Sequence, residues 1–125
     1  MNTPNKKIVE ILIETIIDVG GRVTSRDYIT MVLKTIVDKT SSDYPLLKNI
    51  KITSSSYSSS SSALRISRNI DKEDPKVLGK ALQKIIDQIA GPCSGKGGKN
   101  EFLIMLKGYI GENNTIVLSN MGIKL

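Results

Sequence analysis

Residues 74–92 have the sequence DPKVLGKALQKIIDQIAGP, and they decide the fold more than any other stretch of the chain. An aspartate followed by a proline is typical of a helix start, because the carboxylate caps free N–H groups and the fixed φ of proline suits the first helical position. Apolar side chains then recur every three or four residues, at Val77, Leu78, Ala81, Leu82, Ile85, Ile86 and Ile89. We therefore expect a long amphipathic helix that begins at Pro75 and ends at Gly91-Pro92.

The polar side of this stretch carries a lysine at every fourth position. Residues four apart on a helix are neighbours, so like charges there repel slightly unless solvent or an anionic partner surrounds them. The positive charge is concentrated in this part of the chain, since residues 51–100 hold nine basic and four acidic side chains, against a net charge of +6 overall. The pattern indicates either a solvated face or a surface for an anionic partner. The row consists of Lys72, Lys76, Lys80 and Lys84.

A first helix is expected near the N-terminus. Thr3 followed by Pro4 suits a helix start, and apolar side chains repeat at three and four residues up to Val19, where Gly20 and Gly21 end the pattern. The helix should therefore span about residues 4 to 19. Acidic residues interrupt the apolar run at helical spacing, as on the wet face of a soluble helix, which argues against an export signal: Glu10, Glu14 and Asp18.

A second helix should follow a Gly-Gly-Arg-Val turn. Thr24 with Asp27 three residues later fits a capping box. The expected apolar stripe of this helix is Tyr28, Ile29, Val32, Leu33, Ile36 and Val37. Beyond a turn at residues 40–45, Leu46 and Leu47 fit a short helical turn.

The apolar spacing then changes from helical to alternating. Ile50 and Ile52 flank Lys51, and Leu64 and Ile66 flank Arg65, so we expect two strands. Residues 54–62 are eight serines and one tyrosine, which should form the tip of this hairpin. If the apolar side chains turn onto the helix at residues 75–91, the side chains that face outward are Lys51, Thr53, Arg65 and Ser67, with Arg68 near the strand end.

The C-terminal quarter is apolar and fits two structures. The run from Phe102 to Leu106 continues at helical spacing to Tyr109 and Ile110, and Met121-Gly122-Ile123 fits the end of a helix with an apolar residue after the glycine. We therefore favour a helix for residues 101–118. The alternative is a second hairpin with residues 112–114 as its turn. Together these elements predict one α+β domain, residues 1–125, that is predominantly helical.

Composition limits the chemistry. The chain has no histidine and one cysteine, Cys93, so common zinc sites, Cys-His nucleophiles and an internal disulfide cannot be built from it. We expect no cofactor, no metal site and no enzymatic activity, and a reducing cytoplasm is the natural location. The carboxylates Asp71, Glu73 and Asp74 are more consistent with a solvated turn and a helix cap than with a metal site.

A glycine- and lysine-rich loop follows the long helix. Residues 91–100 have the sequence GPCSGKGGKN, but only three residues separate Gly91 from the Gly-Lys pair, and no Ser or Thr follows that pair, so this is not a P-loop. Glycine N–H groups, Lys96 and Lys99, and a helix start after Asn100 could together hold an anion. The alternative is a flexible connection between helices.

The order of elements in the first half resembles a winged-helix domain. Residues 8–33, with GGRVTS between two helices, look like the opening of such a domain, and the serine-rich hairpin lies where its wing would be. The resemblance covers at most residues 6–68 and implies nucleic-acid binding. It departs at residues 43–50, where the recognition helix would contain Pro45 and carry Lys48 as its only basic side chain.

Two functions therefore stand as the main hypotheses, and an enzyme that acts on a phosphorylated small molecule at the glycine- and lysine-rich loop stays open as a third. The first is a small cytoplasmic interaction or regulatory module that forms a homodimer or binds a protein partner, because the aliphatic stripes exceed what one small core needs. The second is a nucleic-acid-binding protein that uses its basic middle region. The candidate residues for nucleic acid or another anion are Lys51, Arg65, Arg68, Lys76, Lys80, Lys84, Lys96 and Lys99.

Overall fold

The structure, a computed structural model, describes residues 4–52, 64–93 and 98–125. Within these residues the chain forms a predominantly helical α+β fold, as predicted. The α-helices are α1 (Asn5–Val23), α2 (Arg26–Thr40), α3 (Pro75–Cys93), α4 (Gly98–Ile110) and α5 (Glu112–Asn120). The strands are β1 (Ile50–Ile52) and β2 (Leu64–Ile66), and two 3₁₀ helices, η1 (Pro45–Asn49) and η2 (Arg68–Lys72), flank them in the sequence.

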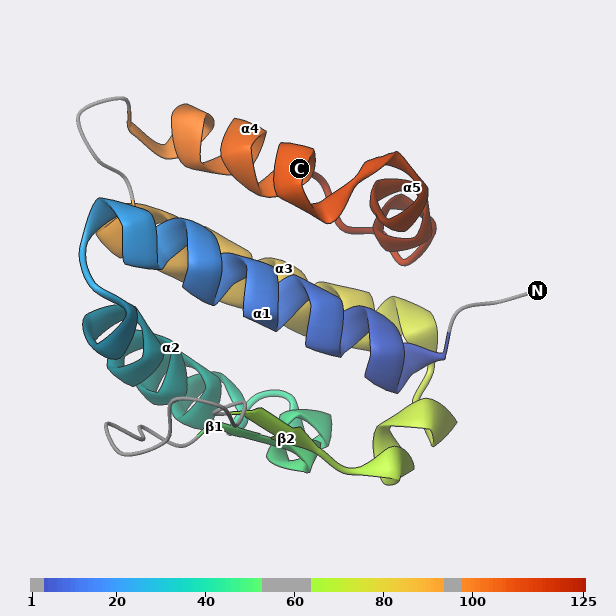
Figure 1. Ribbon diagram of the computed structural model, residues 1–125. Helices are drawn as coiled ribbons and strands as arrows, with labels where there is room; N and C mark the ends of the chain where they lie inside the picture. Colours follow the sequence, from blue (N-terminus) through green and yellow to red (C-terminus); the bar gives the residue numbers. More distant parts are fainter. Residues whose placement is uncertain (1–3, 53–63, 94–97) are drawn as a thin grey trace.

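Two helices that run in the same direction form the centre of the molecule, since the start of α1 lies beside the start of α3. Figure 1 shows α1 and α3 side by side, with α4 and α5 on one side of them and α2 and the hairpin on the other. Aliphatic side chains from both central helices are fully buried between these layers, among them Ile8, Leu12, Leu82 and Ile85. The single phenylalanine of the chain, Phe102, closes the core from α4. The core is therefore aliphatic, as the low aromatic content requires.

The first helix runs further than its sequence pattern predicts. It continues through Gly20 and Gly21 and ends at Val23 rather than at Val19. Gly20 is buried, and a Cβ atom at Gly21 would lie 3.3 Å from the Cα atom of Arg26. The absence of a side chain at these glycines therefore lets the end of α1 lie close to the start of α2, and the glycines do not end the helix.

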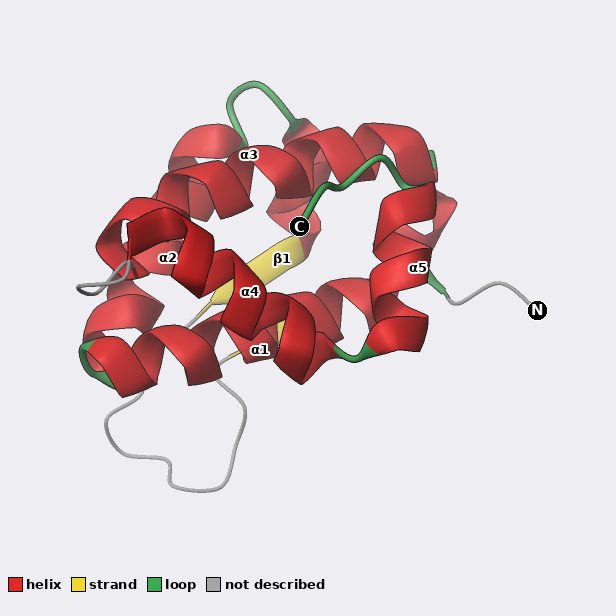
Figure 2. Cartoon of the chain, turned by 90° about the horizontal axis from the view of Figure 1, so that it is seen from above, coloured by secondary structure: helices red, strands yellow, loops and turns green. Residues whose placement is uncertain are grey.

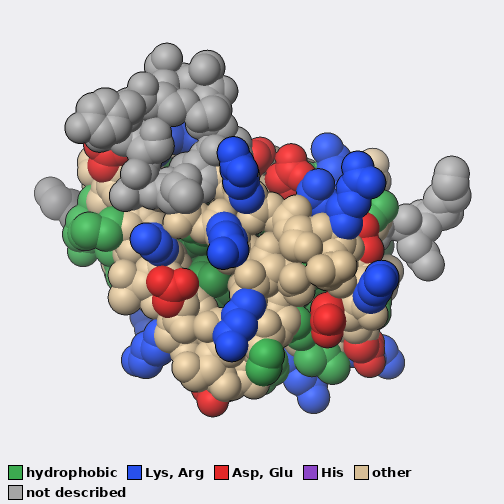
Figure 3. All heavy atoms as spheres, turned by 90° about the horizontal axis from the view of Figure 1, so that it is seen from below, with side chains coloured by type: hydrophobic (Ala, Val, Ile, Leu, Met, Phe, Trp, Pro, Cys, Tyr) green, Lys and Arg blue, Asp and Glu red, His purple; other side chains and the backbone are tan. Residues whose placement is uncertain are grey.

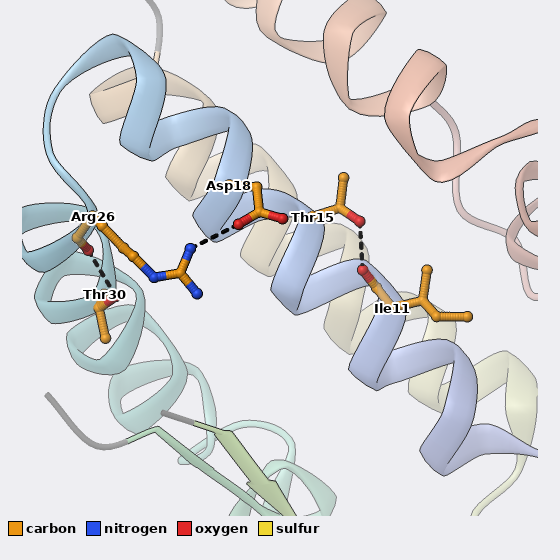
Figure 4. A network of polar contacts seen from close by, with 5 residues as sticks. All are labelled: Ile11, Thr15, Asp18, Arg26 and Thr30. Carbon is orange, nitrogen blue, oxygen red and sulfur yellow. Dashed lines mark hydrogen bonds and ion pairs between the residues drawn. The ribbon is translucent and has the colours of Figure 1, made fainter. Parts of the chain in front are cut away.

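Ser25, and not Thr24, caps the second helix. The Oγ atom of Ser25 accepts a hydrogen bond from the N–H of Tyr28 at 3.1 Å, whereas the hydroxyl of Thr24 donates back to the carbonyl of Gly20. An ion pair of 2.7 Å then joins α2 to α1, between the Arg26 guanidinium and the Asp18 carboxylate (Figure 4). The predicted capping box of Thr24 and Asp27 is therefore wrong, because the Thr24 hydroxyl bonds to the preceding helix and Ser25 takes the cap position.

The hairpin has the predicted strands, but it lies in a different place. Ile50 pairs with Ile66, Lys51 with Arg65, and Ile52 with Leu64, and the apolar members of each strand are buried. β1 packs mainly against α2, and β2 packs mainly against α1. The expectation that the strands turn onto the helix at residues 75–91 is therefore wrong. The predicted serine-rich tip, residues 54–62, lies outside the described residues.

The third helix begins where its sequence indicates. The Asp74 carboxylate accepts a hydrogen bond from the N–H of Lys76 at 2.9 Å, which confirms the cap, and Pro75 is the first helical residue. The helix ends at Cys93, beyond the predicted stop. Pro92 lies in its last turn, where a missing N–H group removes a single helical hydrogen bond.

The C-terminal region is helical, so the preference for a helix is confirmed and the second hairpin is excluded. Gly111, with a φ of +91°, separates α4 from α5, and residues 112–114 begin α5 instead of forming a strand turn. The predicted end is a Schellman motif: Gly122 has a φ of +92°, and the N–H of Ile123 donates to the carbonyl of Leu118 at 3.0 Å. No helix within the described ranges has both the length and the apolar character needed to cross a membrane.

Candidate functional site

The outer face of the hairpin carries two of the predicted cations. Lys51 and Arg65 are both exposed and are directly opposite each other in the antiparallel register. Arg68 is exposed at the start of η2, close behind β2 in the sequence. None of the three forms an ion pair with another residue that the structure describes. Their charges therefore remain available to a partner.

The lysines of α3 lie on a separate element. Lys76, Lys80 and Lys84 are exposed, while Leu78 and Leu82 on the opposite side of the helix are buried. The predicted continuity between this row and the hairpin depended on packing of the strands against α3. Because the hairpin packs on α1 and α2 instead, the structure does not bring the row and the hairpin together through that contact.

The glycine- and lysine-rich loop is described only at its ends. Lys96 belongs to residues 94–97, which lie outside the described ranges. Lys99 is exposed in the first turn of α4, which begins at Gly98, three residues before the predicted start after Asn100. The clustered carboxylates near η2 have structural contacts: Asp71 accepts a hydrogen bond from the backbone N–H of Lys6 at 2.7 Å, and Asp74 caps α3.

A groove beside the hairpin is lined by two lysines that are not among the candidate residues predicted from the sequence, Lys34 and Lys48. It lies between α2, η1 and β1, encloses about 440 Å³ and contains Lys34, Lys48 and Lys51 in its wall. We call it the lysine groove. The rest of its lining is Asp38, Ser41, Leu47, Ile50 and Ile52. Figure 3 shows the face of the molecule that carries the hairpin, where lysine and arginine side chains recur with acidic ones among them.

Nothing in the sequence spacing of Lys34 and Lys48 indicates that the two lysines line the same groove. Lys34 is four residues before Asp38 on α2, which is the spacing of an ordinary solvated helix pair. The two lysines come to one groove only because η1 turns the chain back so that β1 packs beside α2. The one signal in the sequence was the excess of basic over acidic residues in the neighbouring segment, residues 51–100.

A second candidate surface lies at the opposite side of the molecule, on α4. Five consecutive residues, 102–106, are apolar, but only Phe102 and Leu106 are buried. Ile104 is 71% exposed, the highest value among the large apolar side chains that are exposed in the described chain, and Leu103 and Met105 beside it are partly buried. Glu101 and Lys107 are exposed on either side. We call Glu101, Ile104 and Lys107, which are exposed and three residues apart on one side of the helix, the outer face of α4; Figure 2 looks onto this helix from above.

No family of proteins, no curated protein and no solved structure matches this chain. The winged-helix resemblance therefore depends on element order alone, and it departs where a recognition helix is needed. Residues 45–49 form a five-residue 3₁₀ helix, η1, with Leu46 and Leu47 buried. Such a segment is too short to lie in a major groove and present several side chains to base edges.

Proposed function

We propose that this chain is a non-enzymatic cytoplasmic interaction module that self-associates through the outer face of α4. The observation that carries the proposal is the exposure of Ile104, at 71%, within an apolar run on a helix that already covers the core with its other side. A helix that is apolar on both sides is normally covered on both sides. The single cysteine, Cys93, supports a reducing compartment.

The charges around Ile104 favour a second copy as the partner. Glu101 and Lys107 are each three residues from Ile104, in opposite directions along α4. When two copies of α4 pair in an antiparallel manner around Ile104, the Glu101 carboxylate of one copy lies at the same level as the Lys107 ammonium of the other. A parallel pair would instead align like charges. The surface is therefore complementary to itself under two-fold symmetry, which is the commonest symmetry of homo-oligomers.

The size of the patch sets the expected strength. Burying an exposed aliphatic side chain contributes about 1.5–3 kcal/mol, and stable interfaces bury about 1,200–2,000 Å² in total. A pair of single helices provides less area than this. The dimer should therefore be in exchange with the monomer, with a Kd in the micromolar range or weaker, and should tolerate salt because its centre is apolar.

Sedimentation across a protein concentration series tests the proposal. Ile104→Lys should shift the chain to monomer without loss of helical signal, whereas Ile116→Lys, at another exposed isoleucine on α5, should leave the dimer unchanged. Glu101→Lys and Lys107→Glu should each weaken the dimer, and the double variant should restore it. A wild-type chain that is monomeric at every concentration would rule the proposal out, as would equal effects of Ile104→Lys and Ile116→Lys.

A further inference from the structure

The lysine groove has the charge of an anion-binding surface. Three lysines, Lys34 on α2, Lys48 on η1 and Lys51 on β1, line it together with a single acidic residue, Asp38. The net charge of the lining is thus +2, and all four side chains are exposed. No described residue neutralises any of the lysines by an ion pair. Like charges gathered from three separate elements are unfavourable in the isolated protein, and an anionic ligand would relieve that repulsion.

The positive charge continues beyond the groove. Lys51 forms part of the groove wall, and its cross-strand partner Arg65 carries the same charge across the outer face of the hairpin. On the far side of β2, Arg65 lines a smaller hollow together with Lys6 and Glu10. The cations therefore follow a path across the hairpin and do not converge on one point. A path of this kind matches a ligand that bears several phosphates in succession.

We propose that the lysine groove and the adjoining Arg65 bind the sugar-phosphate backbone of a nucleic-acid duplex. Lysine is a flexible point charge without the fixed geometry of a bidentate donor, so it contacts phosphates and does not distinguish bases. None of the groove-lining residues is aromatic, which disfavours a single strand because its bases require stacking partners. A small phosphorylated metabolite is also a poorer match, because the polar side chains of the lining are exposed or, at Ser41, partly buried, and none is a fully buried donor.

Duplex binding and self-association would use opposite sides of the molecule. α4 lies on one side of the central helices, and α2 and the hairpin lie on the other (Figure 1). A dimer formed through α4 would leave the lysine groove of each copy exposed. Substitutions in the groove should therefore alter nucleic-acid binding without altering sedimentation.

Fluorescence anisotropy with a labelled DNA duplex, repeated over a salt series, tests the proposal. Phosphate contacts from the three lysines of the groove and from Arg65 predict a slope of about −3 to −4 in the plot of log K against log salt concentration. The single variants Lys34→Gln, Lys48→Gln and Lys51→Gln should each reduce the magnitude of this slope by about 0.9. Asp38→Asn should raise the affinity, because it removes the one negative charge from the groove wall. Lys124→Gln, at an exposed lysine that the dimer interface does not include, is the matched control and should leave the slope unchanged.

Competition by other anions separates the ligand classes. Unlabelled duplexes of unrelated sequence should compete equally, and a single strand of equal length should compete less well. The proposal is overturned by an absence of binding at low salt, by a slope that the triple lysine variant leaves unchanged, or by weaker binding of Asp38→Asn. It is also overturned if inorganic phosphate or polyglutamate, at matched ionic strength, competes as well as the duplex does.

Discussion

Lys51 on β1 and Arg65 on β2 are a directly opposed pair of like charges on the outer face of the hairpin. Opposite charges at such positions stabilise a sheet by about 0.2–1 kcal/mol, and like charges destabilise it. Lys51→Glu should therefore raise the free energy of unfolding by an amount in this range, as measured by urea denaturation. The same substitution should weaken duplex binding, because it places a carboxylate in the lysine groove.

The double variant Lys51→Glu/Arg65→Glu provides the control for this prediction. It restores a like-charged pair, so the gain in stability should disappear. If Lys51→Glu is no more stable than the wild type, the two side chains do not repel each other across the strands, and the electrostatic argument for the hairpin face fails.

Gly79 is where the C-terminal turn approaches α3. A Cβ atom at this position would lie 1.9 Å from the backbone carbonyl oxygen of Met121, so neither group can move aside cheaply. Gly79→Ala should lower the free energy of unfolding by about 1–3 kcal/mol, the usual cost of overpacking. Gly91→Ala, in the same helix, meets nothing within 4 Å and should be neutral or stabilising. Equal effects of the two substitutions in denaturation experiments would contradict this account.

Asn5 ties the start of α1 to the segment before α3. Its side-chain amide donates to the carbonyl oxygens of Ile70 and Glu73, both at 2.9 Å, and the residue is buried. Asn5→Asp keeps the shape but replaces the donor by a carboxylate that faces those two carbonyls. The expected loss of stability is about 1–3 kcal/mol at neutral pH, since one buried and one partly buried acceptor lose their donor. Asn113→Asp, exposed in the first turn of α5, should cost nothing by comparison in thermal denaturation.

Glu14 should make stability depend on pH. Partial burial, followed by repulsion from Glu10 and Asp18, raises the pKa of its carboxyl above the ordinary value of 4.5. The folded state therefore binds this proton more tightly than the unfolded state does, so the contribution to stability is present at acid pH. It is lost as the pH rises from 4.5 through the raised pKa.

Glu14→Gln should accordingly raise the Tm at pH 7, and its advantage over the wild type should shrink as the pH falls towards 4.5. Glu112→Gln should not raise the Tm, because a carboxylate in the first turn of α5 favours that helix. A pH-independent difference between Glu14→Gln and the wild type would show that lost packing, and not charge, sets its effect.

Local chemistry explains which elements the sequence could predict. The Asp74 cap, the alternation around Lys51 and Arg65, and the Gly122 turn each depend on residues within a few positions of one another. These features were all predicted, and the structure has them. The end of α1 was predicted wrongly because Gly21 lies close to Arg26, at the start of α2. No local sequence pattern reveals this contact.

The same limit applies to the candidate site. Lys51 and Arg65 could be selected because strand alternation fixes the face on which they lie. Lys34 and Lys48 could not, since their place in the groove depends on how β1 returns to α2. The packing of the hairpin against α1 and α2, instead of α3, could not be predicted for the same reason. Several helices have an aliphatic stripe, and the sequence does not show which of them the strands contact.

The contact between residues 121–124 and the middle of α3 has a consequence for synthesis of the protein. The backbone N–H of Lys124 donates to the Gln83 side chain at 2.7 Å, and Met121 lies against Gly79. One side of the middle of α3 is thus covered by a segment that is synthesised about 41 residues later. While the chain emerges from the ribosome, the first three helices can associate, but that side of α3 stays uncovered until the last turn arrives. A nascent chain stalled before residue 121 would expose an incomplete core to chaperones and proteases.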